Sequence, residues 1–171
     1  LLLILSFIRH ETRINEPILN LGLFTKNTTF ALSNLAALLN FSATFALGFL
    51  LSLHLQVVLC YNSQVAGFIM LLQPVIMAIL SPFAGTLSDK IQPRVVASIG
   101  MALTAIGLFM FHFLTADTPL WFILFNLVLM GTGFALFSSP NGNAIMSSVE
   151  KKYYGIASST IATMRLIGQT I

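Results

Sequence analysis

The sequence predicts an all-α integral membrane protein, a helical bundle with four complete transmembrane helices and a partial helix at each end. Of the 171 residues, 57% are apolar and only 8% are charged, whereas soluble domains carry about 25% charged residues. The mean hydropathy is +0.92. The charges are spaced so that several uncharged runs reach the length of about 20 apolar residues that crosses a membrane. A soluble enzyme is not expected to bury so many uncharged helices in succession.

The predicted spans lie in the runs that contain no charged residue. Residues 27–88 hold two spans, separated by the polar stretch Cys60–Ser63, and residues 95–116 hold a third. Residues 118–149 hold a fourth span and a polar exit at Ser138–Asn143. The predicted bounds are 34–56, 63–87, 94–115 and 119–140 for the complete spans and 154–171 for a partial one.

The first 33 residues precede these spans. Residues 1–8 are predicted to end an earlier transmembrane helix, because the charged stretch Arg9–Glu11 follows them without the small residues of a signal-peptide cleavage site. Residues 9–33 are too polar to cross a membrane and form a cytoplasmic or interfacial linker. Pro17 suits the first turn of a helix, and the apolar patch after it fits a segment lying along the inner membrane surface. An ordinary loop is the alternative.

The basic residues divide the loops between the two sides of the membrane. The loops on one side carry every basic residue outside the last helix: Arg9, Arg13, Lys26, Lys90, Arg94, Lys151 and Lys152. The loops at 57–62 and 116–118 carry none. Because Lys and Arg accumulate on the cytoplasmic side, the first group is expected in the cytoplasm of a multi-pass plasma-membrane protein. The net charge of +3 therefore indicates orientation in a lipid bilayer and no nucleic-acid partner.

No pattern in the sequence indicates enzyme chemistry. Cys60 is the one cysteine, and the sequence has no metal-ligand spacing, nucleophile–base pair or phosphate-binding loop. We therefore expect no catalytic residue, no metal and no bound cofactor. No Asp or Glu lies inside the four complete spans, so these spans supply no membrane-embedded carboxylate for proton transfer. His54 and His112 are either titrating groups or structural ones.

The strongest local signal is the loop at residues 85–94. Gly85 permits a close helix approach at the end of a span. Asp89 lies at a tight cytoplasmic turn, where it is expected to accept hydrogen bonds from amides at the start of the next helix. Lys90 and Arg94 keep the turn in the cytoplasm. The alternative is a generic charged loop between two spans.

This loop resembles the cytoplasmic signature of the major facilitator superfamily, G-x-L-x-D-[RK]-x-G-[RK]-[RK]. The matching positions are Gly85, Leu87, Asp89, Lys90 and Arg94. Gln92 stands where the family has glycine, and Pro93 stands where it has a basic residue. The resemblance implies a gating loop that holds one conformation of a transporter and permits the switch to the other.

A wider resemblance covers nearly the whole chain. It is to fourteen-span drug:proton antiporters of the EmrB/QacA type, and it rests on Glu11, Pro17, Leu19, Phe24, Phe30, Leu55–Gln56, Ala66–Gly67, Leu72–Pro74, Gly155–Ser159, Arg165 and Gly168. Cys60 stands where that branch often has glycine. The resemblance implies that residues 34–171 form the first part of a C-terminal transporter bundle. It also implies a proton gradient, a hydrophobic or cationic small-molecule substrate, and the remaining N-terminal half as a partner.

Arg165 is the one charged residue inside a predicted helix. If that helix starts near Tyr154, Arg165 lies about 16 Å along it at 1.5 Å per residue. A charge at such depth costs at least about 2.5–3.5 kcal/mol. Arg165 is therefore expected to serve the substrate pathway or a gate, or else to reach back to the inner surface or bind backbone carbonyls. The uncharged candidates for the pathway are Asn40, Gln56, Gln73, Asn126 and Gln169.

Pro74 and three small residues are candidates for helix bending and packing. Pro74 removes a backbone N–H inside a span and frees the carbonyl of Met70, which predicts a kink that is either structural or faces a cavity. Gly155 and Ser159 share one helix face, and Gly168 follows in the same helix. Small residues let helices approach closely in lipid, either to slide or to pack statically.

These observations together predict a secondary active transporter that exports drug-like compounds by proton-coupled alternating access. Two alternatives stay open. One is a solute importer with the same fold, and the other is a truncated membrane protein that transports nothing.

Overall fold

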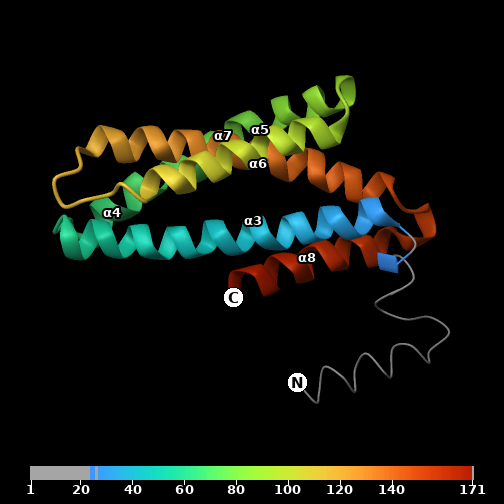
Figure 1. The fold of residues 1–171 in the computed structure, drawn as a ribbon, viewed down its shortest axis with the longest axis horizontal. Coiled ribbons are helices and arrows are strands. Elements are labelled where there is room, and N and C mark those ends of the chain that lie inside the picture. The colour runs from blue at the N-terminus through green and yellow to red at the C-terminus, as the bar shows by residue number, and fades with distance from the viewer. Residues whose placement is uncertain (1–23, 26, 171) are drawn as a thin grey trace, which may run out of the picture.

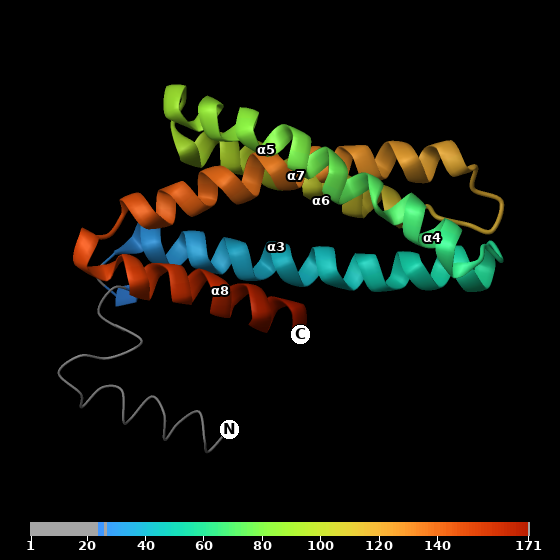
Figure 2. The same ribbon diagram turned by 180° about the vertical axis from the view of Figure 1, so that it is seen from behind.

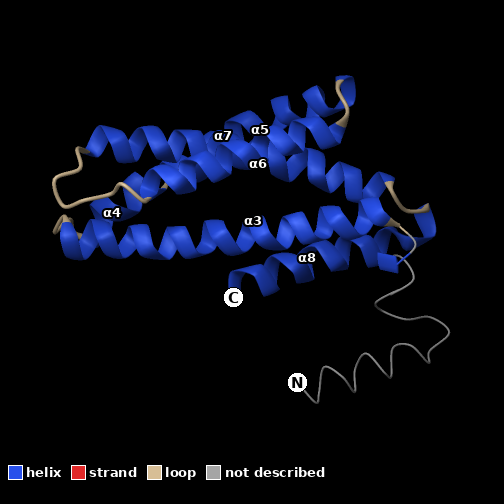
Figure 3. Cartoon of the chain, viewed as in Figure 1, coloured by secondary structure: helices blue, strands red, loops and turns tan. Residues whose placement is uncertain are grey.

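The computed structural model describes residues 24, 25 and 27–170, which form an all-helical bundle in agreement with the predicted fold class (Figures 1 and 3). Its elements are α3 (Thr28–Leu53), η1 (His54–Val58), α4 (Ser63–Met70), α5 (Leu72–Lys90), α6 (Pro93–Phe111), α7 (Leu120–Ser147), η2 (Lys151–Tyr153) and α8 (Tyr154–Thr170). Within the described residues, four stretches are long and apolar enough to cross a membrane: Thr28–Val58, Ser63–Lys90, Pro93–Phe111 and Leu120–Ser147. The predictions for residues 1–8 and for most of the linker lie outside the described residues.

Helix α3 begins at Thr28, so the predicted linker of residues 9–33 is too long at its end. Asn27 caps the helix, because its side-chain oxygen accepts a hydrogen bond from the backbone N–H of Phe30 at 3.0 Å. The Asn27 amide also donates to the Ser148 carbonyl at 2.5 Å, which ties this helix start to the end of α7. The polar residues near the start of α3 are thus a helix cap and a first turn instead of a loop.

Helix α7 runs to Ser147, so the predicted span end at 140 and the polar exit at Ser138–Asn143 are wrong. Pro140 lies inside the helix, as transmembrane helices tolerate when neighbours bond the freed groups. The two asparagines after it point to other helices. Asn141 donates to the Ser33 carbonyl at 3.1 Å, and Asn143 donates to the Ser88 hydroxyl at 3.4 Å. The two asparagines here join α7 to other helices, although Asn143 is itself exposed.

Two further boundaries differ from the prediction. Helix α6 ends at Phe111 instead of near 115, and His112 forms its C-cap. The span predicted at 63–87 is two helices, α4 and α5, interrupted at Leu71, and α5 continues to Lys90. The residues that resembled the signature loop are therefore mostly the last turns of α5.

The helices form two layers, and α7 belongs to one layer and contacts the other. Figures 1 and 2 show α5, α6 and α7 on one side and α3 with α8 on the other, and α7 packs on α5, α6 and α3. Buried apolar side chains gather in two clusters. The first cluster joins the ends of α3, α4, α6 and the start of α7, and consists of Leu51, Leu55, Ala66, Ile69, Phe111, Ile123, Leu127 and Met130. The second, at the other end, consists of Phe30, Ile145, Val149 and Ala157.

Helices α6 and α7 touch backbone to backbone where Gly100 faces Gly133. A Cβ atom added to Gly100 would lie 2.6 Å from the Gly133 carbonyl oxygen, and one added to Gly133 would lie 2.9 Å from the Gly100 carbonyl oxygen. Thr104 is buried beside them and donates its hydroxyl to the Gly100 carbonyl at 3.0 Å. Lipid provides no hydrophobic driving force for helix association. Close van der Waals contact between backbones therefore stabilises the packing of α6 on α7.

The loops with positive charge gather at one end of the bundle. Lys90, Arg94, Lys151 and Lys152 lie at the end where α5, α7 and η2 turn (Figure 1), and Cys60 lies in the turn at the opposite end. Lys152 forms an exposed ion pair with Glu150 at 2.8 Å, and this hydrogen bond raises the pKa of Lys152, so the lysine keeps its charge. The arrangement agrees with the predicted orientation in the membrane.

We expect Gly100→Ala to lower the stability of the protein by about 1–3 kcal/mol, because the added methyl group overlaps backbone atoms of α7. Thermal unfolding in detergent measures this effect. Gly48→Ala is the matched control, since no atom lies within 4 Å of a Cβ atom there, and this change should stabilise the protein by at most about 1 kcal/mol. Equal melting temperatures for the two variants would contradict the close approach of α6 and α7.

We expect a membrane-impermeant maleimide to label Cys60 in intact cells, in a protein whose other cysteines are replaced. The thiol is exposed in the turn after η1, on the side that carries no lysine or arginine. The control combines Cys60→Ser with Lys151→Cys and should react only after the cells are permeabilised. Labelling of Lys151→Cys in intact cells would reverse the proposed orientation.

Candidate functional site

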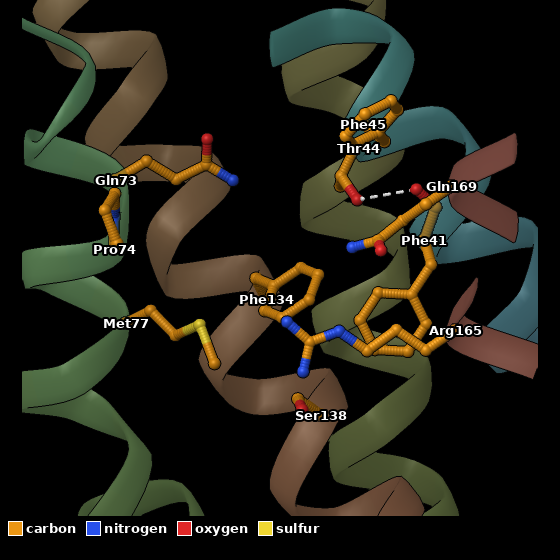
Figure 4. Close-up of a pocket in the computed structure, with 10 residues that line it drawn as sticks. All are labelled: Phe41, Thr44, Phe45, Gln73, Pro74, Met77, Phe134, Ser138, Arg165 and Gln169. Atoms are coloured by element: carbon orange, nitrogen blue, oxygen red, sulfur yellow. Dashed lines mark hydrogen bonds between the residues drawn. The ribbon is translucent and has the colours of Figure 1, made fainter. Parts of the chain in front are cut away.

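A cavity of about 320 Å³ lies between α3, α5, α7 and α8, between the two apolar clusters (Figure 4). Its lining combines aromatic, polar and one charged side chain: Phe41, Thr44, Phe45, Gln73, Pro74, Met77, Phe134, Ser138, Arg165 and Gln169. The volume lies at the lower end of the range of about 300–1,000 Å³ that is usual for small-molecule sites. A site near the middle of a helical membrane bundle is also where substrates of secondary transporters bind.

The interruption between α4 and α5 places Gln73 and Pro74 at this cavity. Helix α4 ends at Met70 and α5 begins at Leu72, but the chain stays helical between them. The Leu71 N–H donates to the Gly67 carbonyl, and the Val75 N–H donates to the Leu71 carbonyl. Pro74 has no N–H to donate to the Met70 carbonyl and lines the cavity. Gln73 and Met77, one turn apart on α5, point into it (Figure 4).

Helix α3 contributes aromatic rings to the opposite wall. The rings of Phe41 and Phe134 meet edge to face, with centroids 5.5 Å apart, a geometry that aromatic pairs prefer. The Thr44 hydroxyl donates to the Asn40 carbonyl at 2.7 Å. Its oxygen can still accept a hydrogen bond from a ligand.

Arg165 extends from α8 into the cavity. Its guanidinium carbon lies 5.5 Å from the centroid of the Phe41 ring, within the range of a cation–π interaction. Figure 4 shows the guanidinium between Phe134 and Ser138. In the described part of the chain, no carboxylate lines the cavity with it. The structure thus places Arg165 at the cavity, and its role in a substrate pathway stays a prediction.

Gly168 sets how closely α8 approaches α3. A Cβ atom added to Gly168 would lie 2.7 Å from the Leu38 carbonyl oxygen and 3.1 Å from the Ser42 nitrogen. Because Arg165 and Gln169 are four residues apart, they share the neighbouring face of the helix and both reach the cavity. Gly155 and Ser159 behave differently, since both are exposed and no described atom lies within 4 Å of a Cβ atom at Gly155.

The structure brings Arg165 and Gln73 together, but it places Gln56 and Asn126 elsewhere. Gln56 belongs to the far turn, where it donates to the Ser52 hydroxyl and accepts from the Ser63 hydroxyl, each at 2.9 Å. Asn126 is fully buried between α7 and α6 and donates to the Gly107 carbonyl at 3.0 Å. Both amides are helix-packing groups and do not line the cavity.

Sequence reasoning missed most of the wall of the cavity. The missed residues are Phe41, Thr44, Phe45, Met77, Phe134 and Ser138. Their spacing of three or four residues within α3, and of four between Phe134 and Ser138, places them on single helix faces. That signal does not distinguish a cavity from lipid, because the same spacing is also found on faces that contact the bilayer.

The residues of the signature loop occupy the inner end of the bundle. Asp89 lines a second cavity with Pro93, Asn143 and Tyr154, the first residue of α8. The hydrogen bonds expected between Asp89 and the start of α6 are not observed. Instead, the Ser88 hydroxyl donates to the Gly85 carbonyl at 2.7 Å and accepts the bond from Asn143.

The two departures from the signature have local structural roles. Pro93 is the first residue of α6, the position that best tolerates proline. The side-chain oxygen of Gln92 accepts a hydrogen bond from the Arg94 Nε atom at 2.9 Å. The turn is therefore braced by side-chain contacts, while Lys90 is exposed and Leu87 is partly so.

Comparison with known proteins places the chain in one family. The sequence profile of the Major Facilitator Superfamily matches residues 8–171. The chain is 31% identical over 165 residues to the riboflavin transporter RibZ of Clostridioides difficile, which covers 96% of this chain and 36% of RibZ. It is 32% identical over 165 residues to the multidrug resistance protein Stp of Mycobacterium tuberculosis, covering 96% of this chain and 30% of Stp.

A third relative is the uncharacterized transporter YebQ of Escherichia coli, 30% identical over 164 residues, which cover 96% of this chain and 36% of YebQ. The chain thus spans about a third of the length of these relatives. The profile match extends over nearly all of the sequence, and the helices, the inner loop and the mid-bundle cavity agree with it. The chain belongs to the major facilitator superfamily of membrane transporters.

Proposed function

We propose that this chain is the first part of the C-terminal bundle of a proton-coupled exporter of small, largely hydrophobic molecules. The observation that carries the proposal is the cavity between the two apolar clusters, to which four different helices contribute aromatic and polar side chains. The names of two relatives support export, namely the multidrug resistance protein Stp and the colistin resistance protein EmrB of Acinetobacter baumannii. The name of RibZ supports carriage of an organic small molecule.

The proposed mechanism is alternating access, in which this bundle rocks against an N-terminal half in the plasma membrane. The packed clusters at the two ends of the bundle keep each end stiff. The cavity between them is open to a ligand and to the partner bundle. In the described helices α3 to α8, Asp89 is the one Asp or Glu within the membrane-spanning stretches, and it lies one residue before the end of α5. Proton coupling rests on the resemblance to drug:proton antiporters.

The hydrophobic part of the expected substrate class has more support than the cationic part. Phe41, Phe45 and Phe134 offer apolar contact area to a ligand. The one charged side chain in the lining, Arg165, carries a positive charge and would repel a cation.

Efflux of a neutral aromatic dye from preloaded cells tests the proposal. Cells that express the full-length protein should lose dye faster than cells without it, and a protonophore should abolish the difference. Phe134→Ala should slow efflux about 3- to 10-fold, because it removes one aromatic contact of about 0.5–1.5 kcal/mol. Phe125→Ala is the control, since Phe125 lies on the same helix with 54% of its surface exposed.

Other outcomes contradict particular parts of the proposal. Efflux that continues with the protonophore contradicts proton coupling. Accumulation of dye in place of loss indicates an importer. If the protein is present in the membrane at normal amounts and moves no dye in either direction, the non-transporting alternative is favoured.

We expect Asp89→Asn to reduce transport at least about tenfold while the protein still inserts and folds. The carboxylate lies beside the start of α8, and a helix start attracts negative charge. Removing the charge should weaken the inner closure and leave the cavity intact. Asp117→Asn is the control, because Asp117 is an exposed acid in the loop between α6 and α7. Normal transport by Asp89→Asn would contradict the gating role.

A further inference from the structure

The cavity contains a positive charge that the described residues do not neutralise. Arg165 is the one charged side chain in its lining, and in the part of the chain that the structure describes it has neither an ion pair nor a hydrogen bond. Its side chain also points into the cavity in Figure 4 instead of along the surface of α8. Arg165 is exposed in the described structure, so its guanidinium is available to a ligand.

The position of Arg165 determines which of its groups a ligand meets. The guanidinium lies over the Phe41 ring, with 5.5 Å between its carbon and the ring centroid. In the described residues no hydrogen bond occupies its N–H groups. Those N–H groups form a planar fork that fits two carboxylate oxygens side by side. The wall thus offers a site for a planar anion.

The rest of the lining fits a flat, polar-edged molecule. Phe134 meets Phe41 edge to face and presents a second apolar surface near the guanidinium. The amides of Gln73 and Gln169 enter the cavity from α5 and α8, and neither forms a hydrogen bond with another described residue. Each can donate and accept hydrogen bonds with carbonyl or hydroxyl groups of a ligand. The volume of about 320 Å³ suits a compound of one or two rings.

We infer, on the basis of the proposed transport function, that the preferred substrates are aromatic anions, whose carboxylate binds Arg165 and whose ring packs against Phe41 and Phe134. This class replaces the cationic compounds that the resemblance implies. A cation would have to approach a guanidinium that no described carboxylate neutralises. An aromatic anion gains both the charge contact and the ring contact.

Three compounds that share one ring system test the substrate class. We would measure equilibrium binding and counterflow of 2-naphthoate, neutral 2-naphthamide and cationic 2-naphthylmethylammonium, with the full-length protein in zwitterionic vesicles. The anion should bind at least about tenfold more tightly than the amide, because hydrogen bonds to charged groups are the stronger ones. The cation should bind most weakly. Repeating the assay with anionic lipid in the vesicles shows whether a lipid headgroup competes for the same site.

Variants of the chain test whether Arg165 causes the preference for the anion. Arg165→Gln should reduce the preference for naphthoate over naphthamide to less than about threefold, mainly by weakening the binding of naphthoate. Arg165→Lys should keep part of the preference, since it keeps the charge but loses the planar fork. Lys151→Gln is the matched control, because it removes one positive charge from an exposed turn far from the cavity. A melting temperature for each variant identifies any loss of folding.

The outcomes separate the substrate class from the transport function. If the wild-type protein binds the amide or the cation as tightly as the anion while counterflow proceeds, the substrate class is wrong and transport stands. The same result is expected if an acid of the partner half already pairs with Arg165. If anionic lipid displaces naphthoate and no naphthoate moves in counterflow, the charge holds lipid and the inference is wrong. Absence of counterflow for all three compounds also overturns the inferred substrate class. The dye-efflux assay then tests the proposed function separately.

Discussion

The need to bond every backbone polar group inside a lipid bilayer governs this structure. Lipid offers no hydrogen bonds, so long helices persist even where the sequence contains residues that end helices in soluble proteins. Helix α7 shows this, because it continues through Pro140 and two asparagines to Ser147. Those asparagines bond to other helices. Two places within the spans depart from α-helix. One is the π-helix η1 at His54–Val58, and the other is Leu71, two residues before Gln73 of the cavity lining.

The lipid bilayer also determines which contacts stabilise helix packing. Because lipid tails are as apolar as leucine, helices gain little by burying hydrophobic surface against each other. Many large apolar side chains are accordingly exposed on the outside of the bundle, for example Phe68, Trp121 and Phe109 at 65–73%. The tight contacts instead lie where side chains are smallest, at Gly100 with Gly133 and at Gly168 with α3. The second of these contacts places Arg165 at the cavity.

The sequence predicts the number and order of the spans well, because charge-free runs and the sidedness of lysine and arginine are strong signals. It fails for polar residues whose partners are distant in the sequence. Asparagine is common in loops, yet Asn141 lies within α7 and donates a hydrogen bond to Ser33 of α3. Gln56 and Gln73 are indistinguishable as isolated amides, although one braces an outer turn and the other lines the cavity. Only the packing of helices separates these roles.

At Cys60, the family resemblance and the backbone conformation both indicate a position that favours glycine. It stands where related transporters often have glycine, and its φ angle of 55° is the one positive value of a non-glycine residue among those described. A residue with a Cβ atom pays about 1–2 kcal/mol for this conformation. A hydrogen bond from the Ser63 hydroxyl to the Gln56 side chain joins the two helical segments on either side of this turn.

Helix α5 connects the two regions that transport would have to coordinate. Its first turn carries Gln73 and Pro74 at the cavity, and its last turns carry Ser88 and Asp89 at the inner end. Its 19 residues span about 28 Å at 1.5 Å per residue. Pro82 lies inside this helix and removes one of its backbone hydrogen bonds, so α5 is not a uniformly stiff rod. The same helix nevertheless carries side chains of both regions. In the proposed alternating-access mechanism, a displacement of α5 would therefore reach the cavity and the acidic turn beside the start of α8 together.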